Sequence, residues 1–208
     1  MNKPVLEIIA VTYDHGFKLK CFIDSIRSQD EPNWCLHIIH DGSGSIFDEL
    51  KEDLSRNGYL SDPRIVLSCT KDRANDWGHS SREYGLKNRI SDAHYITITN
   101  CDNYYVPTWI SEISSLKQEG LEFMYWDCVH NHKGNGNFDR TCGYGLLNSQ
   151  LRHSWIDIGS VAVNAKIATD VGFSFRDFCG DWDFFEKCLQ QILPDKITKI
   201  PKILFVHN

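Results

Sequence analysis

Strand-like apolar runs alternate with helical segments in the first half of this chain. Apolar and β-branched residues predict strands at 5–13, 35–40, 64–69 and from 95 onward. Helices are predicted between and after them, over 18–29, 47–57 and 81–90, and from Pro107 onward. Because strands joined through helices pair in parallel, the alternation predicts βαβ units and an α/β fold, with a mostly parallel central sheet flanked by helices.

The pattern changes after Gly120. A strand is predicted over 121–129, and it runs into a polar, glycine-rich segment at 130–140 that is too long for a simple connector. Loops of that length are typical of lids and binding loops, or of disordered segments. A strand is then predicted over 156–163, a helix over 181–193 and a strand over 200–206. The sequence contains no repeat, linker or low-complexity tract, so we predict one domain over residues 1–208.

Composition disfavours several classes of protein. The formal net charge of −6 argues against a nucleic-acid-binding protein, which normally carries a basic surface. The 8 cysteines include no Cys-x-x-Cys pair, so the sequence predicts neither a zinc site nor a compact disulfide framework. The N-terminus lacks the composition of a signal peptide, and no apolar run reaches the length of a transmembrane helix. We therefore expect a soluble, cytoplasmic protein.

A polar cluster, Asn100-Cys101-Asp102-Asn103, follows the strand that begins at 95. Open α/β sheets bind ligands beyond the carboxyl ends of their strands, where this cluster would lie. One carboxylate flanked by two amides suits a divalent cation that also holds a phosphate-bearing ligand. A polar turn between a strand and a helix has the same composition. Three further polar clusters stand at strand ends or helix starts: Thr12-Tyr13-Asp14, Asp41-Gly42-Ser43 and Gly180-Asp181-Trp182-Asp183. Alone, each is more often a turn or a helix cap.

Taken together, these clusters resemble the motifs of the GT-A glycosyltransferases, specifically the large family two of nucleotide-sugar-dependent enzymes. The matching positions are Val11-Thr12-Tyr13-Asp14, Asp41-Gly42-Ser43, Asn75-Asp76-Trp77-Gly78 with Ser81-Arg82, Asn100-Cys101-Asp102, and Gly180-Asp181-Trp182-Asp183. The resemblance covers roughly residues 5 to 190. It implies a Rossmann-like GT-A fold and a metal-dependent hexosyltransferase. Because many relatives continue beyond the point at which this chain ends, the chain resembles a minimal, single-domain member.

The sequence departs from the family pattern at four positions. Asn100 stands where the metal motif usually begins with Asp, and Asn103 stands where another Asp is common. Gly180 replaces the Glu that usually precedes the catalytic Asp, and Glu83 replaces an Asn that usually follows the arginine. The two asparagines therefore remove negative charge from the predicted metal site.

The resemblance assigns roles to individual residues. Asp102 is the expected metal ligand, and His207 is either a second ligand or a terminal residue without a role. Imidazole favours Mn²⁺, with Mg²⁺ as the alternative. Asp181 is the expected general base, with Asp183 as the alternate, although an Asp that opens a helix also serves as an N-cap. Nucleotide binding falls to Thr12, Tyr13, Asp14, Asp41, Arg82, Asn100 and Cys101, and the donor and acceptor pocket to Trp126, Asp127, Gly159 and Trp182.

These roles imply transfer of a sugar from a nucleoside-diphosphate donor, expected to be a UDP-sugar, to a hydroxyl group of a glycan or lipid-linked acceptor, with inversion. The metal would stabilise the departing diphosphate, and the base would take the hydroxyl proton. Three alternatives stay open: a nucleotidyltransferase, a degenerate protein that binds nucleotide sugars without turnover, and a retaining transferase. The first is disfavoured because segment 12–18 contains one glycine in place of a Gly-rich basic loop.

Overall fold

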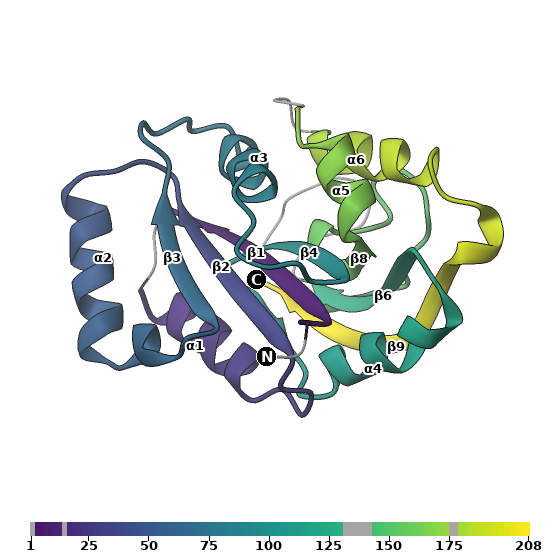
Figure 1. The fold of residues 1–208 in the computed structure, drawn as a ribbon, viewed down its shortest axis with the longest axis horizontal. Helices are drawn as coiled ribbons and strands as arrows, with labels where there is room; N and C mark the ends of the chain where they lie inside the picture. The colour runs from purple at the N-terminus through teal and green to yellow at the C-terminus, as the bar shows by residue number, and fades with distance from the viewer. Residues whose placement is uncertain (1–2, 14–15, 131–142, 175–178) are drawn as a thin grey trace.

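A computed structural model of the chain describes residues 3–13, 16–130, 143–174 and 179–208 (Figure 1). The strands are β1 (Leu6–Thr12), β2 (Trp34–His40), β3 (Ile65–Cys69), β4 (Tyr95–Asn100), β5 (Tyr104–Tyr105), β6 (Phe123–His130), β7 (Gly145–Leu147), β8 (Val161–Asn164) and β9 (Ile197–His207). The α-helices are α1 (Gly16–Arg27), α2 (Ser45–Arg56), α3 (His79–Lys87), α4 (Trp109–Leu116), α5 (Ala165–Val171) and α6 (Gly180–Leu189). No helix in these described ranges is long and apolar enough to cross a membrane.

One mixed sheet runs through the molecule in the order β3-β2-β1-β4-β8-β6-β9-β5, and β7 pairs with β6. The strands β3, β2, β1 and β4 are parallel, as the sequence predicts. The second half is mixed, because β8 runs antiparallel to both β4 and β6 whereas β9 is parallel to β6. The α/β fold with a central sheet flanked by helices is therefore confirmed, and its four consecutive parallel strands come from the first half of the chain.

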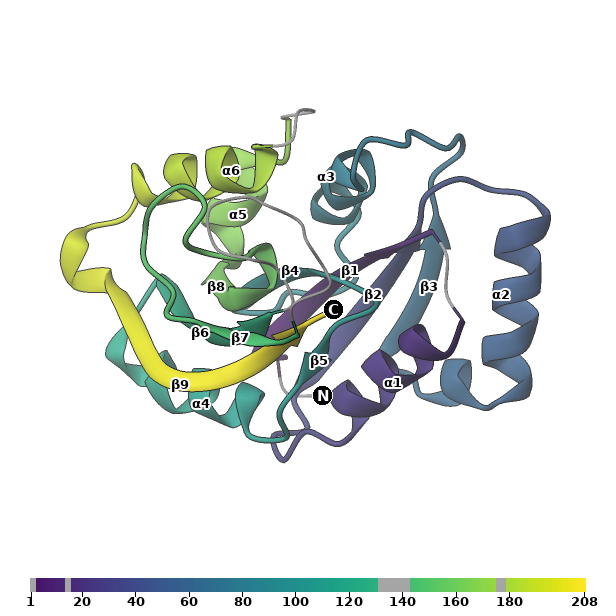
Figure 2. The same cartoon turned by 180° about the vertical axis from the view of Figure 1, so that it is seen from behind.

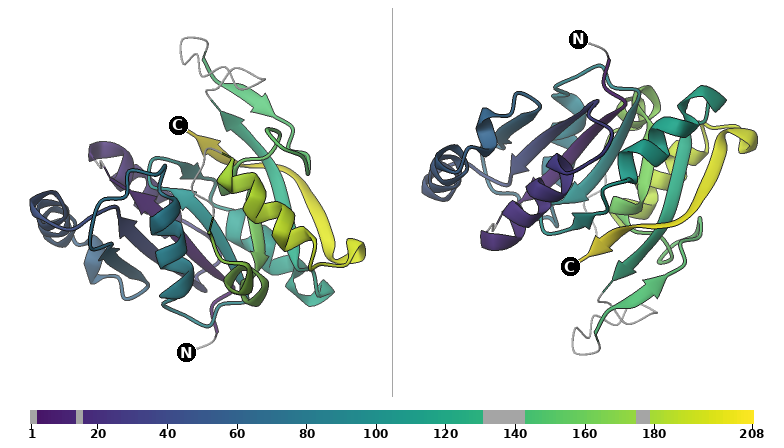
Figure 3. Two further views of the ribbon diagram at one scale, coloured as in Figure 1. Left: turned by 90° about the horizontal axis from the view of Figure 1, so that it is seen from above. Right: turned by 90° about the horizontal axis from the view of Figure 1, so that it is seen from below.

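Helices cover both faces of the sheet. One core cluster joins α1, α2 and α4 to the sheet through side chains such as Phe22, Leu50 and Trp109. The second cluster joins α3, α5 and α6 to the opposite face through side chains such as Leu86 and Phe185. The views from behind, from above and from below agree with this division (Figures 2 and 3). Every residue of β1 and β2 is buried, which explains their near-continuous apolar sequences.

The predicted strand over 156–163 is shorter in the structure. A 3₁₀ turn, Ile158–Ser160, precedes β8, and the helix α5 follows it directly. The side chain of Asn164 caps α5 by accepting hydrogen bonds from the amides of Lys166 and Ile167, at 3.0 and 3.4 Å. This cap ends the strand and starts a helix that the apolar pattern alone does not reveal.

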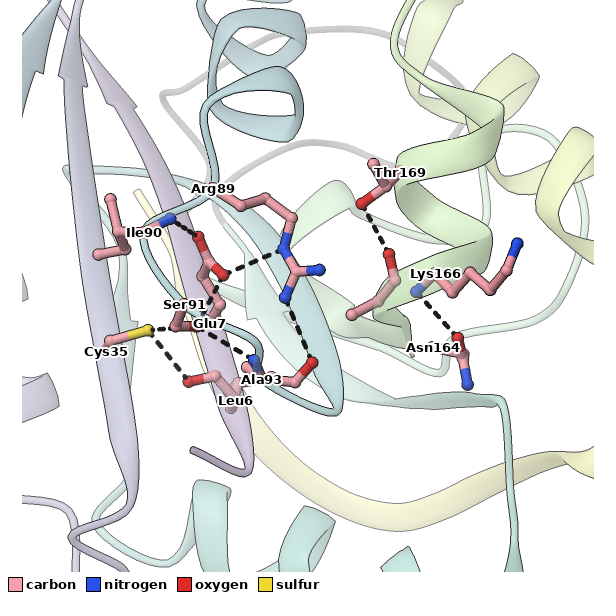
Figure 4. Close-up of polar contacts among 11 residues, drawn as sticks. Leu6, Glu7, Cys35, Arg89, Ile90, Ser91, Ala93, Asn164, Lys166 and Thr169 are labelled. Atoms are coloured by element: carbon pink, nitrogen blue, oxygen red, sulfur yellow. Dashed lines mark hydrogen bonds and ion pairs between the residues drawn. The ribbon is translucent and has the colours of Figure 1, made fainter. Parts of the chain in front are cut away.

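A buried carboxylate fastens the connection between α3 and β4 (Figure 4). Glu7 on β1 is fully buried and accepts hydrogen bonds from the Ile90 amide at 2.9 Å and the Ser91 hydroxyl at 2.8 Å. The Arg89 guanidinium lies 3.2 Å from the same carboxylate. Burial raises the pKa of the neighbouring Cys35 thiol to about 12, so this cysteine stays a neutral core side chain. The contacts from Arg89, Ile90 and Ser91 compensate for burying the carboxylate of Glu7, which would otherwise be costly.

Candidate functional site

The carboxyl ends of β1, β2 and β4 open into a cavity of about 560 Å³. Six residues predicted to bind nucleotide or metal line it: Thr12, Tyr13, Asp41, Asn100, Cys101 and Asp102. The rest of its lining comes from Val11, Gly16, Phe17, Lys18, Arg73, Asn75, Trp77, Gly78 and Ser81. The predicted Asp14 lies outside the described residues. The cavity therefore stands at the sheet edge where open α/β folds bind ligands.

Asp41 joins β2 to the loop that precedes α3. Its two carboxylate oxygens accept hydrogen bonds from the amides of Ala74, at 2.9 Å, and Asn75, at 3.1 Å. Gly42 allows this approach, since a Cβ there would lie 3.1 Å from the backbone nitrogen of Arg73, and its φ of 99° is one that glycine adopts readily. Asp41 thus forms one wall of the cavity and fixes the loop that forms another.

Tyr13 carries a cation on its ring. The Arg73 guanidinium carbon lies 3.4 Å from the Tyr13 ring centroid, and the His40 ring stacks at 5.7 Å. Arg73 stands in the connection after β3 without a motif of its own, so the sequence does not predict its place beside Tyr13. A planar cation stacked on an aromatic ring favours binding of flat or anionic groups beside it.

The segment after β4 presents the Asp102 side chain to the cavity. Asp102 is 39% exposed at its side chain, and the Lys18 ammonium group lies 3.9 Å from its carboxylate. The neighbouring Asn103 is buried and donates to the Thr99 hydroxyl at 3.0 Å. Asn208 donates from its side-chain amide to the Asp102 carbonyl oxygen at 2.8 Å. The C-terminal strand is therefore tied directly to the predicted metal motif.

His207 is paired with the carboxylate of Asp157, which belongs to none of the motifs in the sequence. Its Nδ1 lies 2.8 Å from an oxygen of Asp157, and each side chain is 17% exposed. Burial acts to raise the pKa of Asp157, but His207 and the Gly159 amide outweigh it and hold that pKa below its usual value. Burial acts to lower the pKa of His207, but Asp157 outweighs it and raises that pKa. Metal-binding histidines are commonly oriented by such a carboxylate.

The donor set here fits a divalent cation that is shared with a ligand. Within the described residues, no three His, Cys, Asp or Glu side chains are arranged to hold a metal by themselves. Asp102 lies close enough to His207 to help raise the pKa of that imidazole. Two protein ligands leave most of a six-coordinate shell for phosphate oxygens and water, as is common for Mg²⁺ and Mn²⁺ at nucleotides.

Arg82, which the sequence assigns to nucleotide binding, links the end of β4 to the start of α6. Its guanidinium donates to an Asp181 oxygen at 2.7 Å and to the Asn100 side-chain oxygen at 3.1 Å, and it is 3% exposed. Desolvation raises the pKa of the Asp181 carboxyl, although Arg82 acts in the opposite direction. The residue preceding this Asp is Gly180, where a Cβ would lie 3.0 Å from the His79 ring. The imidazole therefore occupies space that a larger side chain would need.

The four residues predicted to line a donor and acceptor pocket lie in packed surroundings. Trp126 is fully buried and packs edge-on against Trp109 in the first core cluster, and it is not among the residues that line the cavity described above. Asp127 pairs with Lys199 at 2.6 Å. A Cβ on Gly159 would lie 2.7 Å from Phe205. Trp182 packs against the second cluster. The predicted loop at 131–140 lies outside the described residues.

Comparison with known proteins shows the fold. No family model matches the chain, and neither does any curated protein sequence. Residues 1–349 of TarS from S. aureus superpose with a TM-score of 0.73 at 14% identity, covering 98% of this chain and 60% of that one. This chain has a GT-A fold. The mannosyltransferase PcManGT from Pyrobaculum calidifontis, solved with GDP-Man and Mn²⁺, superposes with a TM-score of 0.67 at 14% identity, covering 99% of this chain and 57% of that one.

A third GT-A structure, GalNAc-T7 with UDP, GalNAc and Mn²⁺, has a TM-score of 0.72 at 12% identity, and the match covers 99% of this chain and 44% of that one. The present chain thus spans about 60% or less of the length of these three proteins. At such low identity the likeness establishes the GT-A fold, and the chemistry must be argued from the side chains of the site.

Proposed function

We propose that this GT-A domain is a metal-dependent glycosyltransferase that moves a sugar from a UDP-sugar to an acceptor hydroxyl group, with inversion. One observation carries the proposal: Asp102 lines the same cavity as Asp41 and Tyr13, and it lies close enough to the His207–Asp157 pair to help raise the pKa of His207. A nucleoside diphosphate needs both kinds of group, an aromatic and polar surface for its flat base and a cation for its two phosphates. Crystal structures of TarS with UDP and with UDP-GlcNAc support a uridine nucleotide as the first donor to test.

Asp102 and His207 would hold the metal, with Mn²⁺ preferred because one ligand is an imidazole. When bound, the ion would neutralise charge on the departing diphosphate. Asp157 keeps the His207 ring oriented through Nδ1, which directs the other ring nitrogen away from the carboxylate. Lys18, close to Asp102, would add a second positive charge beside the phosphates. The binding of Mn²⁺ by PcManGT and GalNAc-T7 agrees with this assignment.

Asp181 would take the proton from the acceptor hydroxyl group. Its position at the start of α6 and its hydrogen bond to Arg82 hold the carboxylate next to the end of β4. The raised pKa of Asp181 makes it a better proton acceptor than an ordinary aspartate. Asp183 lies in the same first turn and is the alternate base. A glycan or lipid-linked acceptor remains our expectation for the hydroxyl donor.

Turnover without an added acceptor tests the proposal directly. Purified protein would be incubated with Mn²⁺ and a panel of UDP-, GDP- and CDP-sugars, and the released nucleotide measured. Release of UDP from a UDP-sugar, absent in Asp102→Ala, supports a glycosyltransferase. Formation of pyrophosphate from UTP and a sugar 1-phosphate would support a nucleotidyltransferase. Nucleotide-sugar binding without release, even with a broad acceptor panel, would indicate a degenerate binding protein. The anomeric configuration of an isolated product distinguishes inversion from retention.

A further inference from the structure

Trp77 is a large exposed aromatic residue in an unusual backbone conformation. It lines the cavity, is 63% exposed and has a φ of 57°. Bulky side chains rarely adopt this left-handed region, and such residues concentrate at ligand-binding sites. An indole of this size left in contact with water also forgoes the burial that usually stabilises it. The unusual backbone conformation and the exposed ring together indicate that Trp77 contacts a ligand and does not serve core packing.

The residues around Trp77 hold its backbone on both sides. Before it, Asp41 accepts hydrogen bonds from the amide of Asn75 and from that of the preceding alanine. After it, Gly78 packs so closely on β1 that a Cβ there would lie 3.0 Å from a Val11 methyl carbon. Asp76 accepts hydrogen bonds from the amide and hydroxyl of Ser80, at 3.0 and 2.6 Å. The loop is therefore fixed while the indole stays exposed, which is the arrangement expected of a preorganised contact surface.

The position of Trp77 in the cavity indicates which part of a ligand it meets. It shares its loop with Asn75, which is bound to Asp41, and these polar groups suit the edge of a nucleobase. Asp102 and Lys18, the groups proposed to face the metal and the phosphates, lie 3.9 Å apart and stand on other segments of the cavity lining. The proposed base, Asp181, does not line this cavity, so an acceptor would approach from elsewhere. We propose that Trp77 forms a stacking wall for the nucleobase of the donor, an inference that rests on the proposed function.

Loss of a residue that stacks on the base and loss of a residue that hydrogen-bonds to its edge should affect nucleotide affinity differently. Every base has a π face, so loss of a stacking partner weakens binding of all nucleotides by about the same factor, roughly 5- to 150-fold. A residue that reads the base edge instead changes the preference among nucleotides. Affinities for UDP and GDP, measured on one set of variants, therefore separate the contribution of Trp77 from that of Asp41.

The test measures dissociation constants of UDP, GDP and UDP-GlcNAc by calorimetry, with Mn²⁺ present. Trp77→Asn removes the ring but keeps a residue that tolerates a positive φ, and Trp77→Phe keeps a ring. Trp155→Phe changes another exposed tryptophan, which stacks with Arg152 and does not line the cavity. Melting temperatures would confirm that all variants fold.

We expect Trp77→Asn to weaken binding of all three ligands by a similar factor, Trp77→Phe to recover most of the loss, and Trp155→Phe to bind like the wild type. Unchanged affinity in Trp77→Asn would overturn the inference while leaving the proposed function intact. A loss confined to UDP-GlcNAc would also overturn it, because the ring would then contact the sugar. Wild-type protein that binds no nucleoside diphosphate would refute the proposed function and this inference with it.

Discussion

The carboxylate of Asp157 lies 2.8 Å from Nδ1 of His207, and a second oxygen of the same carboxylate accepts the Gly159 amide at 2.8 Å. The first contact joins the end of β9 to the 3₁₀ turn before β8, and the second holds the carboxylate in one orientation. Because Nδ1 is engaged, the ring can present only Nε2 to a metal. The pair therefore determines both the tautomer and the direction of the proposed metal ligand.

We predict that Asp157→Asn weakens Mn²⁺ binding in the presence of UDP by about 10- to 100-fold, the usual cost of losing such a partner. The asparagine keeps the shape of the side chain but removes its charge. Titration of Mn²⁺ monitored by electron paramagnetic resonance measures this without relying on activity. Asp195→Asn, at an exposed position distant in sequence, is the matched control. Wild-type Mn²⁺ affinity in Asp157→Asn would show that His207 needs no such orientation or is not a ligand.

The same pair predicts how stability depends on pH in metal-free protein. Asp157 has a pKa below its ordinary value of 3.8, so its contribution is present above pH 3.8 and is lost as pH falls through the folded-state pKa. His207 has a pKa above its ordinary value of 6.5, so its contribution is present below pH 6.5 and is lost as pH rises through the folded-state pKa. The difference in melting temperature between wild type and Asp157→Asn should be largest between pH 3.8 and 6.5 and shrink on both sides. A constant difference from pH 3 to 9 would contradict the pairing.

Asp102 is the second proposed ligand, and its loss should affect function more than folding. The side chain is exposed and stands at a strand end, so Asp102→Ala removes little core packing. We expect Asp102→Ala to lose Mn²⁺-dependent release of UDP while its melting temperature stays near that of wild type. A smaller effect is expected for Asn100→Ala, because an amide adds no charge and its oxygen accepts from Arg82 at 3.1 Å. Wild-type turnover in Asp102→Ala would mean that the metal site is misassigned.

Nucleotide choice should depend on Asp41. A ligand that binds only the folded state raises the melting temperature by mass action, so UDP should stabilise the protein more than GDP or CDP, and more so with Mn²⁺. Asp41→Asn keeps one acceptor oxygen for the backbone amides of Ala74 and Asn75 but changes the groups offered to a base. This variant should therefore reduce the difference among nucleotides. Equal melting shifts for all three nucleotides in the wild type would contradict the uridine assignment.

The sequence predicted the first four strands within a few residues because each is an apolar run of the right length. It also placed polar residues correctly at their carboxyl ends, because parallel strands end at one edge of a sheet. β5 could not be predicted in this way. It consists of Tyr104 and Tyr105, and pairing with Val206 and Phe205, about one hundred positions later, makes it a strand.

The site residues also divide into those that local sequence predicts and those whose roles depend on contacts between distant segments. Asp157 looks like an ordinary strand residue in the sequence, and its role depends on His207, fifty positions away. Arg73 has no local motif, and only the fold brings it onto Tyr13. Trp126 and Asp127 were predicted to share a pocket, yet successive residues of a strand point to opposite faces, so one is buried in the core and the other pairs with Lys199. Long-range pairing therefore sets the roles that local pattern leaves open.

The general base gives the decisive mechanistic prediction. Asp181 accepts a hydrogen bond from Arg82 at 2.7 Å, and an asparagine at this position keeps an oxygen that accepts the same bond. An amide cannot take a proton, so Asp181→Asn should stay folded and keep its UDP affinity while losing transfer activity by roughly 10²- to 10⁴-fold. Its melting temperature should fall, because the buried Arg82 loses the charge of its partner carboxylate. The raised pKa of Asp181 also predicts that wild-type transfer declines with falling pH earlier than an ordinary aspartate would require.

Asp183→Asn is the matched control, since it makes the same chemical change in the same turn of α6. Measured side by side, rates for the two variants identify the base. Loss of activity in Asp183→Asn alone would assign the role of general base to Asp183. The match between this chain and the family motif would then be displaced by two positions. If both variants kept wild-type rates with a UDP-sugar and its acceptor, neither carboxylate would remove the proton. An inverting mechanism with its general base on α6 would then have to be abandoned. The contact between Asp181 and Arg82 would instead have a structural role, joining α6 to the sheet.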